Sequence, residues 1–167
     1  MCIRDSGKCG AKLLFAGGGG TDDDYSEIKN YCKNKNFVEF TGKYNYNNDI
    51  ASLYGRCDVI YSVYDADNPN VKIALPNKLY EAVYCELPII VAKETYLSDI
   101  VNKMGVGVAV SHKNADELVC QLRRLMSEPE YYQKFEYNCR KYKDYINIDK
   151  YNSKLLQCIK LENKRVI

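Results

Sequence analysis

Short apolar runs that alternate with stretches of helical periodicity constrain the fold of this chain more than any other feature. Five runs have the character of buried strands: Lys12–Ala16, Phe37–Thr41, Asp58–Val63, Pro88–Ala92 and Val106–Val110. Strands that are joined through helices run parallel and place the connecting helices on both faces of the sheet. The sequence therefore predicts an α/β, Rossmann-like fold.

The chain has 167 residues, which suffice for one core of ordinary size and not for two full domains. Segment 1–10 joins no downstream pattern and is predicted to be a non-native or disordered leader. Residues 11–127 are predicted to form the Rossmann-like domain. No strand pattern follows Ser111, and residues 128–167 are predicted to form a C-terminal helical extension.

Charge and composition exclude several classes of function. The net charge is only +2 and both signs are interspersed along the chain, so nothing resembles the basic face of a nucleic-acid-binding protein. No apolar run approaches the roughly 20 residues of a membrane span, and no secretion leader is recognisable, which predicts a cytoplasmic location. His112 is the only histidine and no Cys-x-x-Cys pair occurs, so no metal site is predicted.

The segment Leu75–Ala82 (LPNKLYEA) is the most informative one for chemistry. Pro76 suits the first turn of a helix, whose free N–H groups and dipole attract an anion. Lys78 adds a positive charge in that turn, and Glu81 lies three residues later on the same side, with Asn77 bordering that face. This arrangement suits a nucleotide diphosphate, with its ribose hydroxyls on the carboxylate. An exposed ion pair between Lys78 and Glu81, without a ligand, explains the spacing equally well.

A run of glycines follows the first predicted strand, at Gly17, Gly18, Gly19 and Gly20. Glycines allow the backbone to approach a ligand closely. The run is not a dinucleotide fingerprint, because Asp22 stands where the third glycine is required, and no Gly-Lys-Ser/Thr follows as in a P-loop. A tight turn without a ligand is the alternative.

Other polar residues follow the third and fifth predicted strands. Asp65 and Asp67 follow the third strand, where they could bind a metal or meet a sugar, although solvated loop acids are commoner. His112 follows the fifth strand and could reach a cleft, but a surface histidine without a function is the more frequent case.

The series LLFAGGG, FVEFTGKY, DVIYSVYD, LPNKLYEAVYCELPIIV and VGVAV resembles group one GT-B glycosyltransferases, and is most similar to the bacterial branch of capsular and cell-surface polysaccharide synthesis. The likeness extends from Lys12 to about Leu125. The resemblance implies that this chain is the C-terminal, nucleotide-sugar-binding half of such an enzyme. It also implies a missing N-terminal acceptor domain, through which the enzyme could associate with the inner face of the membrane.

The resemblance further implies a set of roles for individual residues. Glu81 would bind the ribose hydroxyls of a UDP- or GDP-sugar donor. The diphosphate would be held by Asn77, Lys78 and the helix start at Pro76, and the loop from Gly17 through Gly18 and Gly19 would line the same cleft. Lys43 and Tyr64 would sit near the base. Enzymes of this family retain anomeric configuration with help from the departing phosphate, so no protein nucleophile and no cofactor are expected.

The sequence departs from the family pattern at two places. Ile73 stands where many members carry a second glutamate, eight residues before Glu81. Family members also begin this domain with another strand and helix. In the usual strand order the missing strand would separate the Lys12 strand from the Asp58 strand and leave two open ladders, which predicts poor stability.

The sequence thus predicts a glycosyltransferase fragment of hexosyltransferase type that transfers sugar to a polysaccharide or glycolipid acceptor and is inactive when isolated. Two alternatives stay open at this point. A GT-B-fold nucleotide-sugar epimerase is one, although its usual histidine and acidic residues have no counterpart here. A non-catalytic Rossmann-like binding or interaction module is the other.

Overall fold

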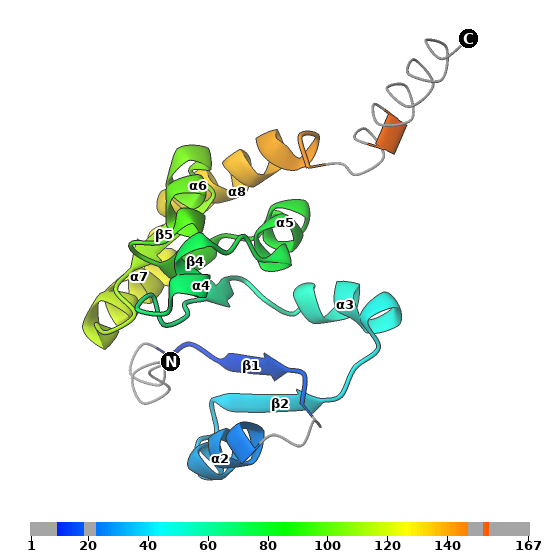
Figure 1. Ribbon diagram of the computed structural model, residues 1–167, viewed down its shortest axis with the longest axis vertical. Helices are drawn as coiled ribbons and strands as arrows, with labels where there is room; N and C mark the ends of the chain where they lie inside the picture. The colour runs from blue at the N-terminus through cyan, green and yellow to red at the C-terminus, as the bar shows by residue number, and fades with distance from the viewer. Residues whose placement is uncertain (1–9, 19–22, 147–151, 154–167) are drawn as a thin grey trace.

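The computed structural model describes residues 10–18, 23–146 and 152–153 (Figure 1). The first half consists of β1 (Leu13–Ala16), α2 (Asp23–Cys32), β2 (Val38–Gly42), α3 (Tyr46–Tyr54) and β3 (Ile60–Ser62). The second half consists of α4 (Pro69–Ile73), α5 (Asn77–Tyr84), β4 (Ile89–Ala92), α6 (Tyr96–Met104), β5 (Gly107–Val110), α7 (Ala115–Ser127) and α8 (Pro129–Lys143). The predicted strands all form, one or two residues shorter at most ends because strand ends lack ladder partners.

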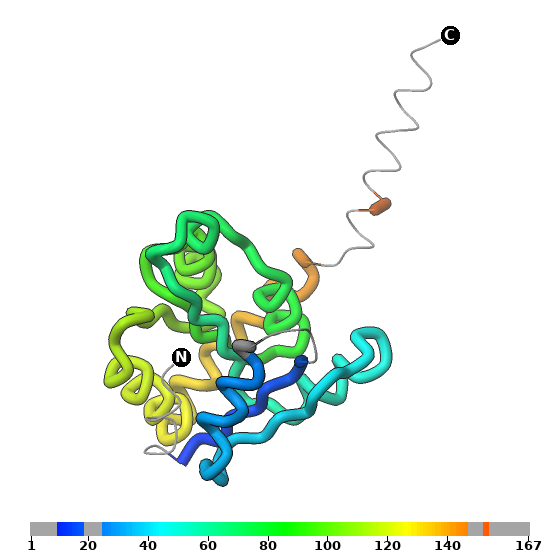
Figure 2. The backbone as a smooth tube through the Cα atoms, turned by 60° about the horizontal axis from the view of Figure 1, so that its bottom comes forward, coloured from blue at the N-terminus to red at the C-terminus, as the bar shows by residue number. Residues whose placement is uncertain are grey.

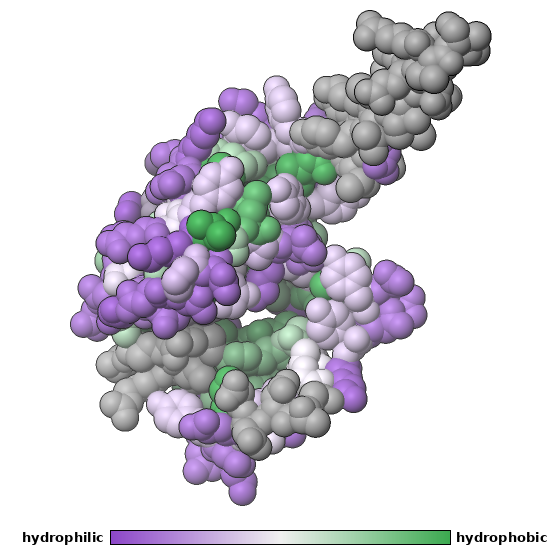
Figure 3. Space-filling view, viewed as in Figure 1, coloured by the Kyte–Doolittle hydropathy of each residue, from purple (hydrophilic) through white to green (hydrophobic). Residues whose placement is uncertain are grey.

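All strand pairs in the described residues are parallel, as predicted, but the strands form two sheets. One sheet pairs β1 with β2, and the other has the order β3-β4-β5. The division falls where the family resemblance places the absent strand, with β1 and β3 on the two facing edges (Figure 1). The space-filling view shows a hollow at this level, with apolar side chains on its wall (Figure 3).

The core lies around the sheet β3-β4-β5, and β4 is its centre. The four residues of β4 are all buried, and successive side chains point to opposite faces. Ile89 and Val91 pack with residues of α5 and α6 in one cluster, whereas Ile90 packs with residues of α7 in the other. Helices therefore cover both faces, as the alternation of strands and helices requires.

Helix α8 contributes to both clusters, although its sequence lies in the predicted C-terminal extension. Cys139 belongs to the cluster around Ile89, and Phe135 belongs to the cluster around Ile90. The helix packs against α5 and α7. It is therefore part of the same packed unit as the elements before it.

The sheet β1-β2 forms a smaller unit with α2. The rings of Phe15 and Phe40 stack at a centroid distance of 5.0 Å, and the ring of Tyr25 from α2 meets Phe40 edge-on at 5.9 Å. Figure 2 shows this unit at one end of the described molecule, with α3 leading from it to the rest. Arg56, just after α3, forms a bidentate ion pair with Glu39 at 2.7 Å, which joins the end of this connection to β2.

The helices outside the core include one short helix between β3 and α5. The segment between β3 and α5 contains the short helix α4, because the Asn68 side chain caps it by accepting from Asn70 N at 2.9 Å and Pro69 occupies its first position. No helix within the described residues has both the length and the apolar character needed to cross a bilayer.

Candidate functional site

The start of α5 is the first part of the candidate site. Pro76 takes the N-cap position in extended conformation, and within the described residues no side chain caps this helix. The carbonyl of Pro76 accepts a hydrogen bond from Leu79 N at 3.1 Å. The N–H groups of Asn77 and Lys78 precede the first intrahelical bond, so they and the helix dipole are directed toward any anion placed here.

The apolar side of α5 fixes how its polar residues are presented. Leu79, Ala82 and Val83 are buried in the core. Asn77 is therefore left exposed, and Lys78 and Glu81 are half-buried at the edge of the helix. The two charged residues do not form an ion pair with each other in this part of the structure, because each has a different partner.

Glu81 accepts hydrogen bonds from two tyrosines of α3. The hydroxyl of Tyr46, at the first residue of α3, donates to Oε1 over 2.7 Å. The hydroxyl of Tyr54, at the last residue, donates to Oε2. The hydrogen bond to Glu81 raises the pKa of Tyr46, and burial followed by the same carboxylate raises the pKa of Tyr54. Both hydroxyls therefore stay protonated as donors at neutral pH.

Lys78 reaches toward the loop after β3. Its Nζ lies 5.4 Å from the centroid of the Tyr64 ring, which brings the loop that follows β3 against the first turn of α5. Tyr64 is 45% exposed, so part of this residue is accessible to solvent. Lys43 is also exposed and lies in the loop between β2 and α3, ahead of Tyr46.

The glycines after β1 divide into two cases. Gly17 N donates to Gly42 O at 3.1 Å, and a Cβ added at Gly17 would lie 4.0 Å from the ring of Tyr44, so this turn adjoins the loop that leads to Tyr46. Gly18 has a φ of +125°, and a Cβ there would lie 2.5 Å from the ring of Tyr25. Packing of Tyr25 thus accounts for Gly18 without a ligand. Gly19 lies outside the described residues.

The structure therefore brings most predicted site residues to one edge of the molecule, where the carboxyl ends of the parallel strands lie. Sequence reasoning missed the two tyrosines that bind Glu81. Tyr54 is the last residue of α3, and Tyr46 is its first. They precede Glu81 by 27 and 35 residues, respectively. No sequence motif at either spacing predicts a hydrogen bond.

Residues 5–142 match the family described as Glycosyl transferases group 1. This chain belongs to that family. The matched segment begins within the predicted leader and ends within α8. The comparison with curated proteins gave no match.

Solved structures agree with this glycosyltransferase fold. HepE from Anabaena, solved in complex with UDP and glucose, is 16% identical with a TM-score of 0.73, and the match covers 93% of this chain and 43% of that one. Sucrose-phosphate synthase from Thermosynechococcus elongatus is 16% identical with a TM-score of 0.70, covering 97% and 42%. WaaG, a glycosyltransferase involved in lipopolysaccharide biosynthesis, is 17% identical with a TM-score of 0.58, covering 80% and 34%. The chain thus spans well under half the length of these proteins.

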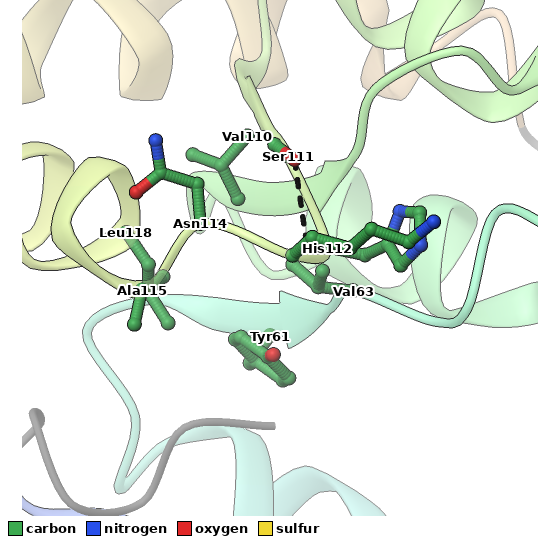
Figure 4. A pocket seen from close by; sticks show the side chains of 9 residues that line it. Tyr61, Val63, Val110, Ser111, His112, Asn114, Ala115 and Leu118 are labelled. Atoms are coloured by element: carbon green, nitrogen blue, oxygen red, sulfur yellow. Dashed lines mark hydrogen bonds between the residues drawn. The ribbon is translucent and has the colours of Figure 1, made fainter.

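In the present chain, a pocket lies at the ends of β3 and β5, and a group of polar side chains lies beside it. The pocket is lined by Tyr61 of β3, by Val63 just after that strand, and by the turn around Ser111 and Asn114 (Figure 4). The ligand atoms of Asp65, Asp67 and His112 lie within 4.8 Å of one another. Lys113 forms an ion pair with Asp67 at 2.5 Å and lowers the pKa of that carboxyl. Lys113 thus already contacts one carboxylate oxygen of Asp67 in this group.

Proposed function

We propose that this chain binds a nucleoside-diphosphate sugar at the start of α5 and is the donor-binding half of a retaining glycosyltransferase. The observation that carries the proposal is the uncapped α5 N-terminus with Lys78 in its first turn and Glu81 one turn deeper. The fold match to HepE, whose structure holds UDP and glucose, supports a nucleotide-sugar donor.

Each element of the site would have a chemical task. The N–H groups of Asn77 and Lys78, the helix dipole and the Lys78 ammonium would neutralise the diphosphate. These groups would also stabilise the negative charge that grows on the diphosphate as it leaves the sugar. Glu81 would accept hydrogen bonds from the ribose hydroxyls. The exposed face of Tyr64 would pack beside the base, with Lys43 nearby.

Transfer to an acceptor needs groups beyond this chain. We place the acceptor, a polysaccharide or glycolipid, on a further N-terminal domain, and we place the enzyme in the cytoplasm of a bacterium at the inner face of the membrane. In this proposal the donor is a UDP- or GDP-hexose and serves as substrate, so no cofactor is assigned. The isolated chain would bind donor without transferring it.

The same proposal includes a further strand between β1 and β3. These two strands face each other across the division between the sheets and each pairs on one side within the described strands, β1 with β2 and β3 with β4. One parallel strand inserted there would join both sheets into a single sheet of the Rossmann-like order.

Calorimetric titration of UDP and of GDP into the chain tests donor binding. We expect one of the two nucleotides to bind, and Lys78→Ala to weaken it by about tenfold or more, because a charge-assisted phosphate contact is lost. Lys103→Ala, at an exposed lysine in the last turn of α6, is the control and should leave affinity unchanged.

Two outcomes would contradict this proposal. One is a folded chain, by circular dichroism, that binds neither nucleotide. The other is binding that Lys78→Ala and Lys103→Ala leave equally strong, which would move the diphosphate away from α5.

A further inference from the structure

Resting on the proposed function, we infer that the two tyrosines of α3 act on Glu81 in different ways. Tyr54 is a positioning residue that holds the carboxylate in its binding orientation. Tyr46 takes the place of a ribose hydroxyl on the same carboxylate and leaves it when a nucleotide binds. The chain thus carries its own competitor for the ribose subsite.

The contacts place the two hydroxyls on different oxygens of Glu81. Tyr46 donates to Oε1 in an exposed hydrogen bond of 2.7 Å, and Tyr54 donates to Oε2 in a partly buried one. Because the tyrosines stand at opposite ends of α3, they approach the carboxylate from two directions. The oxygen that faces solvent is therefore the one that Tyr46 occupies.

The surroundings of the two rings decide which bond can be exchanged. The Tyr54 ring packs against the core cluster around Ile89 and Val91, so its hydroxyl would lose a partner in a partly buried place if it left Glu81. Tyr46 is 53% exposed, and water can replace the carboxylate at its hydroxyl. Release of Tyr46 from Glu81 therefore costs less free energy than release of Tyr54.

The chemistry of a ribose hydroxyl matches the bond that Tyr46 makes. Both groups donate an O–H to a carboxylate oxygen, and an ionised carboxylate has about four lone-pair positions. Tyr54 can therefore keep its position on Oε2 while ribose hydroxyls take the positions that Tyr46 vacates. An oriented carboxylate binds two adjacent hydroxyls better than a freely rotating one, because less rotamer freedom is lost on binding.

The start of α3 does not depend on the Tyr46 hydroxyl. The Asn45 side chain caps the helix by accepting from Asn48 N at 3.2 Å, and Asp49 Oδ2 accepts from Asn45 N at 2.8 Å. These bonds hold the first turn of α3 whether or not Tyr46 contacts Glu81. Removal of its hydroxyl therefore tests the contact rather than the helix.

Nucleotide titrations of Tyr46→Phe and Tyr54→Phe separate the two roles, since each variant keeps its ring and loses one hydroxyl. With UDP, or with GDP if that is the nucleotide that binds, we expect Tyr46→Phe to bind about threefold more tightly, because the competitor is gone. We expect Tyr54→Phe to bind about tenfold more weakly, because Glu81 loses its orientation.

The 2′,3′-dideoxy form of the same nucleotide provides the readout that a merely structural role would not change. It lacks the ribose hydroxyls, so both variants should bind it with the affinity of the unmodified chain. Circular dichroism of each variant confirms that it is folded.

The outcomes distinguish this inference from the proposed function. If the nucleotide binds and Lys78→Ala weakens it, but Tyr46→Phe binds no more tightly or Tyr54→Phe no more weakly, the inference is overturned and the proposed function stands. Effects that persist with the dideoxy nucleotide overturn it as well. A folded chain that binds neither UDP nor GDP overturns both.

Discussion

At the scale of single residues, Glu86 shows how a strained backbone is held in place. It follows α5 with a φ of 60°, a conformation that favours glycine. Glu86 N donates to Val83 O and Leu87 N donates to Ala82 O, which closes the helix in a Schellman motif. Its carboxylate binds Arg140 at 3.0 Å and Lys143 at 3.1 Å, so the side chain joins the end of α5 to α8.

These ion pairs predict a pH dependence of stability. Lys143 and then Arg140 lower the pKa of Glu86 in the folded chain below its unfolded value of about 4.3. A lowered folded pKa adds stability that is present above the unfolded pKa and is lost as pH falls through the folded one. We therefore expect Glu86→Gln to be less stable than the unmodified chain at pH 7, and the difference to shrink as the pH falls below about 4.

Urea unfolding at a series of pH values from 7 to 3 measures this difference. Glu27→Gln, at an exposed carboxylate on α2, is the control. A difference that stays constant across the series would show that the Glu86 ion pairs do not stabilise the fold.

At the scale of elements, β4 and β5 approach each other closely at Gly107. Gly107 pairs with Ile89 in the parallel register, and a Cβ added at Gly107 would lie 1.9 Å from the carbonyl oxygen of Ile89. That oxygen belongs to a strand whose residues are all buried, so it cannot move away from an added methyl group. The glycine is required by packing between two elements rather than by its own dihedral angles.

Substitution of Gly107 by Ala is expected to lower the free energy of unfolding by about 2–3 kcal/mol, the usual cost of forced overpacking in a core. Gly55→Ala is the matched control, because Gly55 has ordinary helical angles after α3 and its nearest contact would be 3.3 Å. Urea unfolding of both variants gives the comparison. Equal stability of the two would mean that β4 and β5 separate without cost.

At the scale of the whole molecule, stability is unevenly distributed. Both core clusters lie in the unit built on β3, β4 and β5. The β1-β2 unit is joined to it through α3, whose tyrosines bind Glu81 and whose end carries the Arg56–Glu39 ion pair. Facing strand edges between the two sheets offer pairing positions to other chains.

We therefore expect the purified chain to unfold below about 45 °C, the lower end of the range for ordinary domains, and to aggregate as its concentration rises. Scanning calorimetry together with size-exclusion chromatography tests this. A sharp unfolding transition of a monomer well above that temperature would contradict it, and would show that the β1-β2 unit is held more firmly than its contacts suggest.

Local patterns in the sequence determined the elements and pointed to much of the candidate site. Alternating apolar runs predicted the parallel strands, and Pro76 marked a helix start that the structure contains. These features could be predicted because caps and periodicity act over a few residues. Lys78 and Glu81 could be predicted as candidate site residues for the same reason, since they lie one turn apart on one helix.

Contacts between distant segments were decided only by the tertiary structure. The sequence does not show that Tyr46 and Tyr54 occupy Glu81, that the ring of Tyr25 covers Gly18, or that Phe135 of α8 completes the core. Each of these contacts joins residues of different elements. Their meeting depends on how whole helices and sheets pack, which is set by the sum of many buried contacts and not by any local pattern.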